Sequence, residues 1–197
     1  MRIIAGAHRG RPLVGPKDQT KTRPITDRVK ESLFNVLVSV GVFDGEPRVL
    51  DVFCGTGSMG LECLSRGVEH VTFVDRDRDA RRRLEQNLQA FRETERARIL
   101  SVDALRGDWP RRVEGPIDLV FLDPPYAMLR EAKTAKRVTE LTRRIAGLCG
   151  RDAILVLRSD RAGRVETLPG WTRYDERRYG EMIIGLFRLE HAGGGSV

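Results

Sequence analysis

From residue 48 onward, short apolar segments alternate with segments whose apolar residues recur at helical spacing. The apolar segments predict β-strands at 48–53, 70–75, 98–103, 117–123 and 153–159. The intervening segments predict helices over 58–66, 79–93 and 129–145. Near-continuous apolar strands that alternate with helices are typical of a parallel sheet with helices on both faces. The predicted fold class is therefore α/β.

Both ends of the chain depart from this alternation. Residues 1–24 are basic and rich in glycine and proline, which predicts a hairpin with loops. A helix is expected next, capped by Thr26 or Asp27 and ending near Gly41. Near the C-terminus, two strands that turn at Gly180 would add an antiparallel edge to the sheet.

The length of 197 residues suits one domain with a sizeable core. We expect an N-terminal hairpin-and-helix extension over 1–45 and the main domain over 46–190. The glycine-rich residues 191–197 are expected to form a disordered tail.

The amino-acid composition indicates the kind of binding partner and the cellular compartment to expect. An excess of Lys and Arg (35) over Asp and Glu (28) gives a net charge of +7, which favours a polyanionic partner. There is neither a secretory signal nor an apolar run long enough for a bilayer, so a cytoplasmic protein without a membrane partner is expected. The three cysteines lack metal-ligand spacing, which indicates free thiols and no metal site.

A glycine-rich loop over 51–60, DVFCGTGSMG, follows the first strand and opens a helix. Its spacing fits a dinucleotide site, an S-adenosylmethionine site or a plain tight turn. Asp51 would repel a pyrophosphate but suits the ammonium group of S-adenosylmethionine. A methyl-donor pocket is therefore the preferred interpretation, with Phe53, Cys54, Gly55 and Gly57 as further cofactor-binding residues.

Acidic residues also follow the next two strands. Asp75 could accept hydrogen bonds from both ribose hydroxyls of an adenosine, whereas Asp77 is expected to be a surface acid. Asp103 could accept a hydrogen bond from the adenine amino group or could equally cap a helix. The adjacent Arg76 and Ala104 are included in the predicted donor site.

The most specific motif is Asp123-Pro124-Pro125-Tyr126, directly after the fourth strand. The prolines stiffen the turn and orient the carbonyl of Pro124 beside the Asp123 carboxylate. These two acceptors could hold both protons of an aromatic amine and free its lone pair for attack on a methyl group. Tyr126 could stack on an extruded base. Catalysis would then depend on positioning more than on acid–base chemistry.

The basic N-terminal segment could follow a phosphate backbone. Four of its arginines are candidate RNA-binding residues: Arg9, Arg11, Arg23 and Arg28. The arginine run 76–83 is expected to be a solvated helix face rather than a second RNA site.

Taken together, these motifs resemble the RsmD family of bacterial methyltransferases, which modify N2 of one guanine in 16S ribosomal RNA. The likeness covers nearly the whole chain and rests on RIIAGAHRGRPL, RPITDRVKESLFNVL, VLDVFCGTGSMGLECLSRG, FVDRD, FLDPPY and RRYGEMIIGLF. It implies a class I S-adenosylmethionine-dependent methyltransferase (Rossmann-like) fold with a seven-stranded, mostly parallel sheet. It also implies an assembling small ribosomal subunit as substrate.

Several departures and alternatives accompany this resemblance. Cys54 and Met59 stand where small residues are usual in the family's loop, and Asp75 where glutamate is common. A DNA adenine-N6 methyltransferase would share the Asp123 motif but needs a larger target-recognition region. A protein-glutamine methyltransferase more usually has Asn at position 123, and an NAD-dependent oxidoreductase needs a second domain. A non-catalytic RNA-binding assembly factor would have broken motifs, which this chain does not. A monomer is expected.

Overall fold

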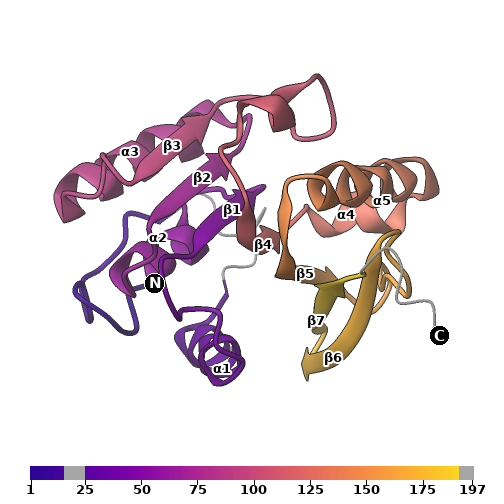
Figure 1. Cartoon of the computed structure of the whole chain (residues 1–197), viewed down its shortest axis with the longest axis horizontal. Helices are drawn as coiled ribbons and strands as arrows, with labels where there is room; N and C mark the ends of the chain where they lie inside the picture. Colours follow the sequence, from indigo (N-terminus) through magenta and orange to yellow (C-terminus); the bar gives the residue numbers. More distant parts are fainter. Residues whose placement is uncertain (16–24, 191–197) are drawn as a thin grey trace.

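A seven-stranded sheet in the order β3-β2-β1-β4-β5-β7-β6 organises the molecule (Figure 1). This computed structural model describes residues 1–15 and 25–190. The first five strands in chain order are mutually parallel, and β7 runs antiparallel to both of its neighbours. Within the described residues, no helix has the length and apolar character needed to cross a membrane.

The elements follow the predicted alternation closely. The strands are β1 (Arg48–Val52), β2 (His70–Val74), β3 (Ala97–Leu100), β4 (Ile117–Leu122), β5 (Cys149–Asp160), β6 (Trp171–Tyr179) and β7 (Met182–Leu189). The helices are α1 (Asp27–Ser39), α2 (Ser58–Ser65), α3 (Arg78–Phe91), α4 (Tyr126–Arg130) and α5 (Ala132–Ala146), with a 3-10 turn η1 (Trp109–Arg112).

Three elements differ from the sequence prediction. The strand expected over 153–159 begins earlier, at Cys149. The helix expected over 129–145 is two helices, because Glu131 adopts an extended backbone between α4 and α5 (φ −85°, ψ 118°). The strand expected over 98–103 ends at Leu100, because the chain turns there. In that turn Val102 donates its N–H to the Leu100 carbonyl, and Asp103 accepts from the N–H of Leu105.

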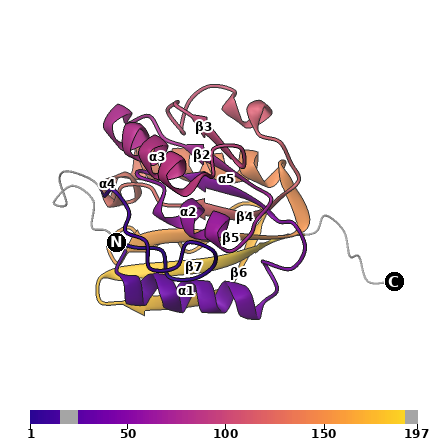
Figure 2. The same cartoon turned by 90° about the vertical axis from the view of Figure 1, so that its left-hand side faces the viewer.

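Helices cover both faces of the sheet, as the apolar strands predict (Figures 1 and 2). One hydrophobic core joins β-strand side chains to α1, α2 and α3, through residues such as Phe34, Leu61 and Leu84. The other core joins the opposite face to η1, α4 and α5, through Trp109, Leu129 and Leu141. The arrangement is a three-layer α/β sandwich.

The C-terminal hairpin turns at Gly180, as predicted. Its second strand, β7, inserts between β5 and β6, so the outermost strand of the sheet is β6. This places residues of β6 three strands away from β4, on a surface shared with α1.

The N-terminal residues form a short hairpin that packs on the α1–α3 face. Arg2 and Pro12 form an antiparallel bridge, and the backbone N–H of Ile3 donates to the Arg11 carbonyl at 3.0 Å. α1 is capped by Thr26, whose hydroxyl accepts from the Val29 N–H at 3.3 Å. The glycine-rich tail and residues 16–24, including Arg23, lie outside the described residues.

A buried ion pair ties this hairpin to the helices. Lys30 of α1 is 1% exposed and Glu62 of α2 is fully buried, with 3.4 Å between Nζ and Oε2. Lys30 also donates to the Arg2 carbonyl at 2.6 Å. The Glu62 carboxylate accepts the backbone N–H groups of Ile4 at 2.7 Å and Ala5 at 3.0 Å. Three segments that are distant in sequence therefore meet at one buried pair.

Candidate active site

The predicted site residues meet at the carboxyl ends of β3, β2, β1 and β4, which are neighbours in the sheet. The N–H of Phe53 donates to the Val74 carbonyl at 2.9 Å, and the N–H of Asp123 donates to the Val52 carbonyl at 3.1 Å. Strand order reverses between β1 and β4, because β2 lies on one side of β1 and β4 on the other. Parallel sheets bind ligands at such a switch point, outside the carboxyl ends of the strands.

The glycine-rich loop begins with an unusual backbone. Phe53 has φ 59°, a left-handed conformation that is rare for a bulky side chain and costs on the order of 1–3 kcal/mol. Gly57 has φ 82°, and a Cβ there would lie 2.4 Å from Cδ1 of Leu84 on α3. Gly55 has φ 54°, and its missing Cβ would point into open space. The loop therefore packs tightly on α3 at Gly57 and leaves room for a ligand at Gly55.

Asp51 lies beneath this loop and is 1% exposed. Its Oδ2 accepts the backbone N–H of Gly60 in α2 at 2.9 Å. Burial, together with the neighbouring charges of Asp123 and Asp75, raises the pKa of Asp51 to about 7. A nearby cation would favour the ionised form, so the position suits a positively charged ligand.

Asp75 closes the donor loop from the end of β2. Its Oδ2 accepts the N–H of Gly55 at 2.8 Å, and its Oδ1 accepts the N–H of Asp77 at 2.9 Å. Each carboxylate oxygen can accept a second hydrogen bond, so both could still receive ribose hydroxyls. Asp77 is exposed, as predicted, and it also caps α3 by accepting from the Ala80 N–H at 2.9 Å.

Asp103 stabilises the turn after β3 and is not the helix cap that the sequence left open as its alternative role, since the next helical element, η1, is preceded by Asp108. Oδ1 of Asp103 accepts the N–H of Leu105 at 3.0 Å, and its Oδ2 accepts from Arg76 at 3.2 Å. Ala104 is buried, and its carbonyl accepts from the indole of Trp109 at 2.9 Å. These contacts hold the loop after β3 in place, and a direct hydrogen bond from Asp103 to adenine stays a prediction.

The Asp123-Pro124-Pro125-Tyr126 turn leads from β4 into α4. Asp123 is paired with Arg158 of β5, whose Nε donates to Oδ1 at 2.6 Å. The guanidinium carbon of Arg158 also lies 5.8 Å from the centre of the Tyr126 ring. Arg158 thus contacts both the expected amine acceptor and the expected stacking surface.

The surroundings of this pair are mainly apolar. Leu33 of α1, Met59 of α2 and Ile184 of β7 line a small pocket together with Asp123 and Arg158. Burial raises the pKa of Asp123, and the charge and hydrogen bond of Arg158 partly oppose that rise. The arginine therefore helps to keep Asp123 ionised and able to accept hydrogen bonds.

Cys54 lies in the donor loop but is unsuited to nucleophilic chemistry. Burial raises the pKa of its thiol well above the ordinary value, and the charges of Asp51 and Asp75 add to that effect. The reactive form of cysteine is the thiolate, which this environment disfavours.

The site as a whole fits a cationic donor. Asp51, Asp75 and Asp123 gather around a loop whose Gly55 leaves open space. Such a carboxylate cluster would repel a pyrophosphate, whereas S-adenosylmethionine carries a sulfonium and an ammonium group. The residues present therefore fit this donor better than a dinucleotide.

Comparison with known proteins agrees with this geometry. The model of a family described as "Conserved hypothetical protein 95" matches residues 1–188. "Ribosomal RNA small subunit methyltransferase D" of Escherichia coli K12 is 32% identical over 194 residues, covering 98% of this chain and 92% of the relative. The chain belongs to the RsmD family.

Other members show the same relationship. "Putative rRNA methyltransferase YlbH" of Bacillus subtilis is 44% identical over 127 residues, which are 64% of this chain and 67% of YlbH. The solved structure of "Putative methyltransferase yhhF" from Escherichia coli is 31% identical with a TM-score of 0.79. The alignment covers 96% of this chain and 98% of that one. The fold is that of a class I methyltransferase, as predicted, and the family and fold imply use of S-adenosylmethionine.

Sequence reasoning missed Arg158. Arg158 lies two residues before the end of β5, where a charged residue indicates only that the apolar run has ended. Its role depends on β5 pairing next to β4, which no local pattern reveals. The available signal was an arginine that directly follows the apolar run 153–157.

Two of the candidate RNA-binding arginines of this RsmD-family chain, Arg11 and Arg28, lie in different parts of the molecule. Arg11 donates to the Ala90 carbonyl at 2.6 Å and stacks over Phe91, at the C-terminal end of α3. That end of α3 adjoins the start of β3, opposite the edge that carries Asp123. Arg28 lies in the first turn of α1 and lines a surface pocket together with Arg177 of β6. The RNA contacts of Arg9, Arg11 and Arg28 stay predictions.

Proposed function

We propose that this protein transfers the methyl group of S-adenosylmethionine to the exocyclic N2 amino group of one guanine in 16S ribosomal RNA. The observation that carries the proposal is the adjacency of the donor loop and the catalytic turn. The backbone of Asp123 is hydrogen-bonded to that of Val52, the last residue of β1, from which the glycine-rich turn leads on. The printed names of the relatives, which are ribosomal RNA methyltransferases, support the choice of RNA.

The donor-binding residues in this proposal are those around the glycine-rich loop. The sequence and geometry support contacts from Asp51, Phe53, Cys54, Gly55, Gly57, Asp75, Arg76, Asp103 and Ala104. When bound, S-adenosylmethionine supplies a methyl group already activated by its sulfonium. The carboxylates compensate the positive charge of the donor, and the Gly55 backbone allows its close approach.

The catalytic turn acts on the amine. The Asp123 carboxylate and the Pro124 carbonyl each accept a hydrogen bond from one N–H of the amine. These two hydrogen bonds orient the nitrogen lone pair towards the methyl group. Pro124 and Pro125 keep this turn stiff, and Tyr126 offers a ring face for the extruded base. Alignment of donor, methyl and acceptor lowers the barrier by replacing a bimolecular encounter with a fixed geometry.

Arg158 adjusts the chemistry of Asp123. Its positive charge at 2.6 Å makes the carboxylate a weaker base than burial alone would. Asp123 therefore acts as a hydrogen-bond acceptor during methyl transfer, and the product amine loses its proton to water afterwards. Little acid–base machinery is needed at this site.

The biological setting is part of the same proposal. We place residues 1–45 as an RNA-binding extension of a methyltransferase domain over 46–190. The substrate is an assembling small subunit, and the enzyme acts as a monomer. An adenine-N6 methyltransferase and a non-catalytic assembly factor are the alternatives that the following experiment separates.

The test is methyl transfer from labelled S-adenosylmethionine to small ribosomal subunits from a bacterial strain that lacks its RsmD-family enzyme. The wild type should yield labelled N2-methylguanosine. Asp123→Ala should lower kcat by about a hundredfold or more while donor affinity is kept. Asp108→Ala, which removes an exposed carboxylate on the surface, is the matched control and should retain activity.

Each other product would overturn part of the proposal. Labelled N6-methyladenosine would reassign the enzyme to adenine. No labelled nucleoside, with donor binding intact, would identify a binding factor without this reaction. Equal activity of Asp123→Ala and wild type would remove the catalytic turn from the mechanism.

A further inference from the structure

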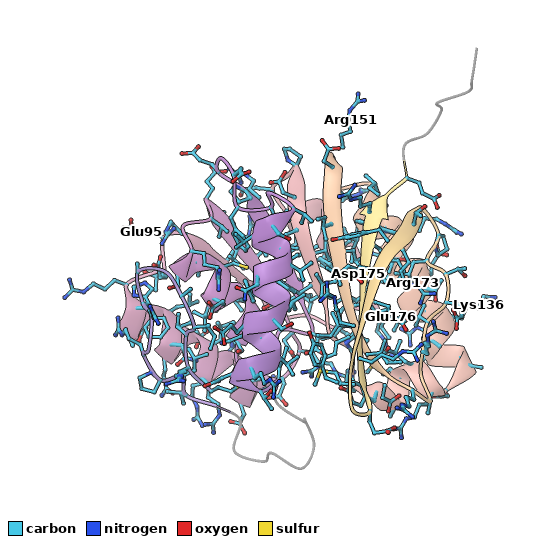
Figure 3. The ribbon with its side chains drawn as sticks, turned by 90° about the horizontal axis from the view of Figure 1, so that it is seen from below. Glu95, Lys136, Arg151, Arg173, Asp175 and Glu176 are labelled. Carbon is cyan, nitrogen blue, oxygen red and sulfur yellow. The ribbon has the colours of Figure 1, made fainter. Side chains whose placement is uncertain are left out.

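An open polar groove lies between α1 and β6, outside the donor pocket. We define this α1–β6 groove by its lining residues, which are Arg28, Glu31, Ser32, Asn35, Val36 and Ser39 of α1 together with Arg177 of β6. Its volume is about 740 Å³, open solvent included. Figure 3 shows α1 on the near side of the sheet, with the labelled residues of β6 to its right.

Strand pairing connects the groove to the catalytic turn. Arg158 pairs with Ile184 of β7, and Ile184 pairs with Arg177 of β6. Asp123 joins this row through its hydrogen bond to Arg158. Neighbours in such a row point to the same face of the sheet. Three strand spacings of about 4.8 Å place the backbone of Arg177 roughly 14 Å from that of Asp123.

The walls of the groove are held together by direct contacts. The Ser32 hydroxyl of α1 and the Tyr179 hydroxyl of β6 lie 2.7 Å apart. Arg177 donates through Nε to Asp175 at 2.9 Å while its side chain stays 44% exposed. The groove is therefore preformed, and its arginine is oriented without being covered.

The chemistry of the lining favours a phosphodiester strand. Two arginines outnumber the single carboxylate, Glu31, and most of the remaining lining side chains carry hydroxyl or amide groups. Arginine, serine and asparagine are typical partners of phosphate and sugar oxygens. Val36 is the one apolar residue among those lining the groove, so an apolar peptide would find little to bury. The open shape suits an extended strand rather than a compact ligand.

We propose that the α1–β6 groove binds the single-stranded RNA next to the target nucleotide, with Arg28 and Arg177 contacting its phosphates. This inference rests on the proposed function, since it takes the nucleotide at Asp123 as the reacting one. It extends to the C-terminal hairpin the binding role that the sequence suggested for residues 1–45, which include Arg28 of α1.

The experiment compares two double variants with equal changes in charge. Arg28→Ala/Arg177→Ala alters the groove, whereas Arg82→Ala/Arg143→Ala removes two exposed arginines from α3 and α5. Binding of a labelled single-stranded RNA of about 12 nucleotides is measured by fluorescence anisotropy over a range of salt concentrations. Methyl transfer to small subunits is measured in parallel.

The groove variant should bind RNA about tenfold more weakly or worse, and its slope of log K against log salt should fall by about 1.4. Its KM for subunits should rise while kcat at saturation and donor affinity stay near wild type. Asn35→Glu, which adds a negative charge within the groove, should weaken binding in the same way. The control variant should show at most a small loss.

Equal losses in the two double variants, or an unchanged salt slope in the groove variant, would overturn the inference. A fall in kcat with no change in RNA affinity would also overturn it, because that pattern indicates damage to the catalytic turn. Wild type that binds no RNA and labels no guanosine would instead refute the proposed function, so the two failures are distinguishable.

Discussion

At the scale of single residues, the contact between Arg158 and Asp123 decides how the catalytic turn works. Burial in apolar surroundings pushes a carboxyl group towards its neutral form, and a neutral Asp123 would present a proton where the substrate amine needs an acceptor. The Arg158 guanidinium at 2.6 Å opposes this effect. Arg158 is therefore a positioning residue that keeps the acceptor ionised.

Replacement of Arg158 with methionine should expose this role in the pH dependence of kcat. Burial of Asp123 remains and its counter-charge is lost, so the pKa of Asp123 rises further. The negative charge of Asp75 raises the pKa of Asp123 as well. Activity needs the carboxylate, so the acidic limb of the profile should move to higher pH. Below the new pKa, kcat should fall about tenfold per pH unit.

Arg158→Lys provides the control because it keeps the positive charge and loses the planar hydrogen-bonding geometry. It should move the acidic limb back towards the wild-type position. Donor affinity, measured by calorimetry, should change little in either variant. If Arg158→Met lowers kcat equally at every pH, the arginine has only a structural role.

At the scale of elements, local patterns predicted what depends on local interactions. The apolar strands, the glycine-rich loop and the Gly180 turn follow from residue spacing, and all are present, although β3 ends early and β5 begins early. The break at Glu131 between α4 and α5 was missed, because no proline or glycine marks it. Arg158 was missed because its partner comes from another strand, and strand order is a property of the whole sheet.

The contacts of Arg11 show that the sequence pattern of a basic residue does not distinguish RNA binding from attachment within the protein. A basic residue in a turn-rich segment reads as a phosphate contact, yet here it stacks on Phe91 and donates to the Ala90 carbonyl. His8, three residues earlier, pairs with the buried Glu93 at 2.6 Å. Part of the basic N-terminal pattern therefore serves to attach the hairpin to α3.

The buried pair Lys30–Glu62 is the corresponding attachment to α1 and α2. Lys30→Met should destabilise the protein by about 3–5 kcal/mol, because it leaves a buried carboxylate short of its cation. Among the residues that the structure describes, Arg66 at 3.0 Å would then be the one ion-pair partner left to Glu62. Chemical unfolding measures the loss of stability. Hydrogen exchange should be faster at the backbone amides of Ile4 and Ala5, which donate hydrogen bonds to the Glu62 carboxylate.

Lys136→Met is the matched control, since Lys136 is exposed on α5 (Figure 3). It should change stability by less than about 0.5 kcal/mol. Lys30→Met/Glu62→Gln should recover part of the loss, because the unpaired charge is removed together with its partner. Equal stability of Lys30→Met and Lys136→Met would show that the pair does not hold the hairpin.

At the scale of the whole molecule, the donor site lowers the folding stability of the protein and favours binding of the cationic donor. Asp51, Asp75 and Asp123 collect at one edge of the sheet, and their mutual repulsion adds to the burial of Asp51. An apolar or neutral edge would fold more stably. A cationic donor relieves the repulsion when it binds, so the destabilising arrangement is the one that favours binding.

Asp51→Asn should separate these two effects. The carboxyl pKa is raised from 3.8 to about 7 in the folded protein. The folded state therefore holds a proton that the unfolded state has released across this interval, and the contribution of Asp51 to stability falls as pH rises from about 4 to about 7. The asparagine can still accept the Gly60 N–H but never carries the charge. The variant should therefore gain stability relative to wild type as pH rises, with unfolding measured in urea at pH 5 and pH 8.

Donor affinity should behave in the opposite way, strengthening through pH 7 in wild type and staying weak and flat in the variant. Parallel pH dependences of both quantities in the two proteins would contradict this account. Asp108→Asn, at an exposed position, controls for the loss of one carboxylate.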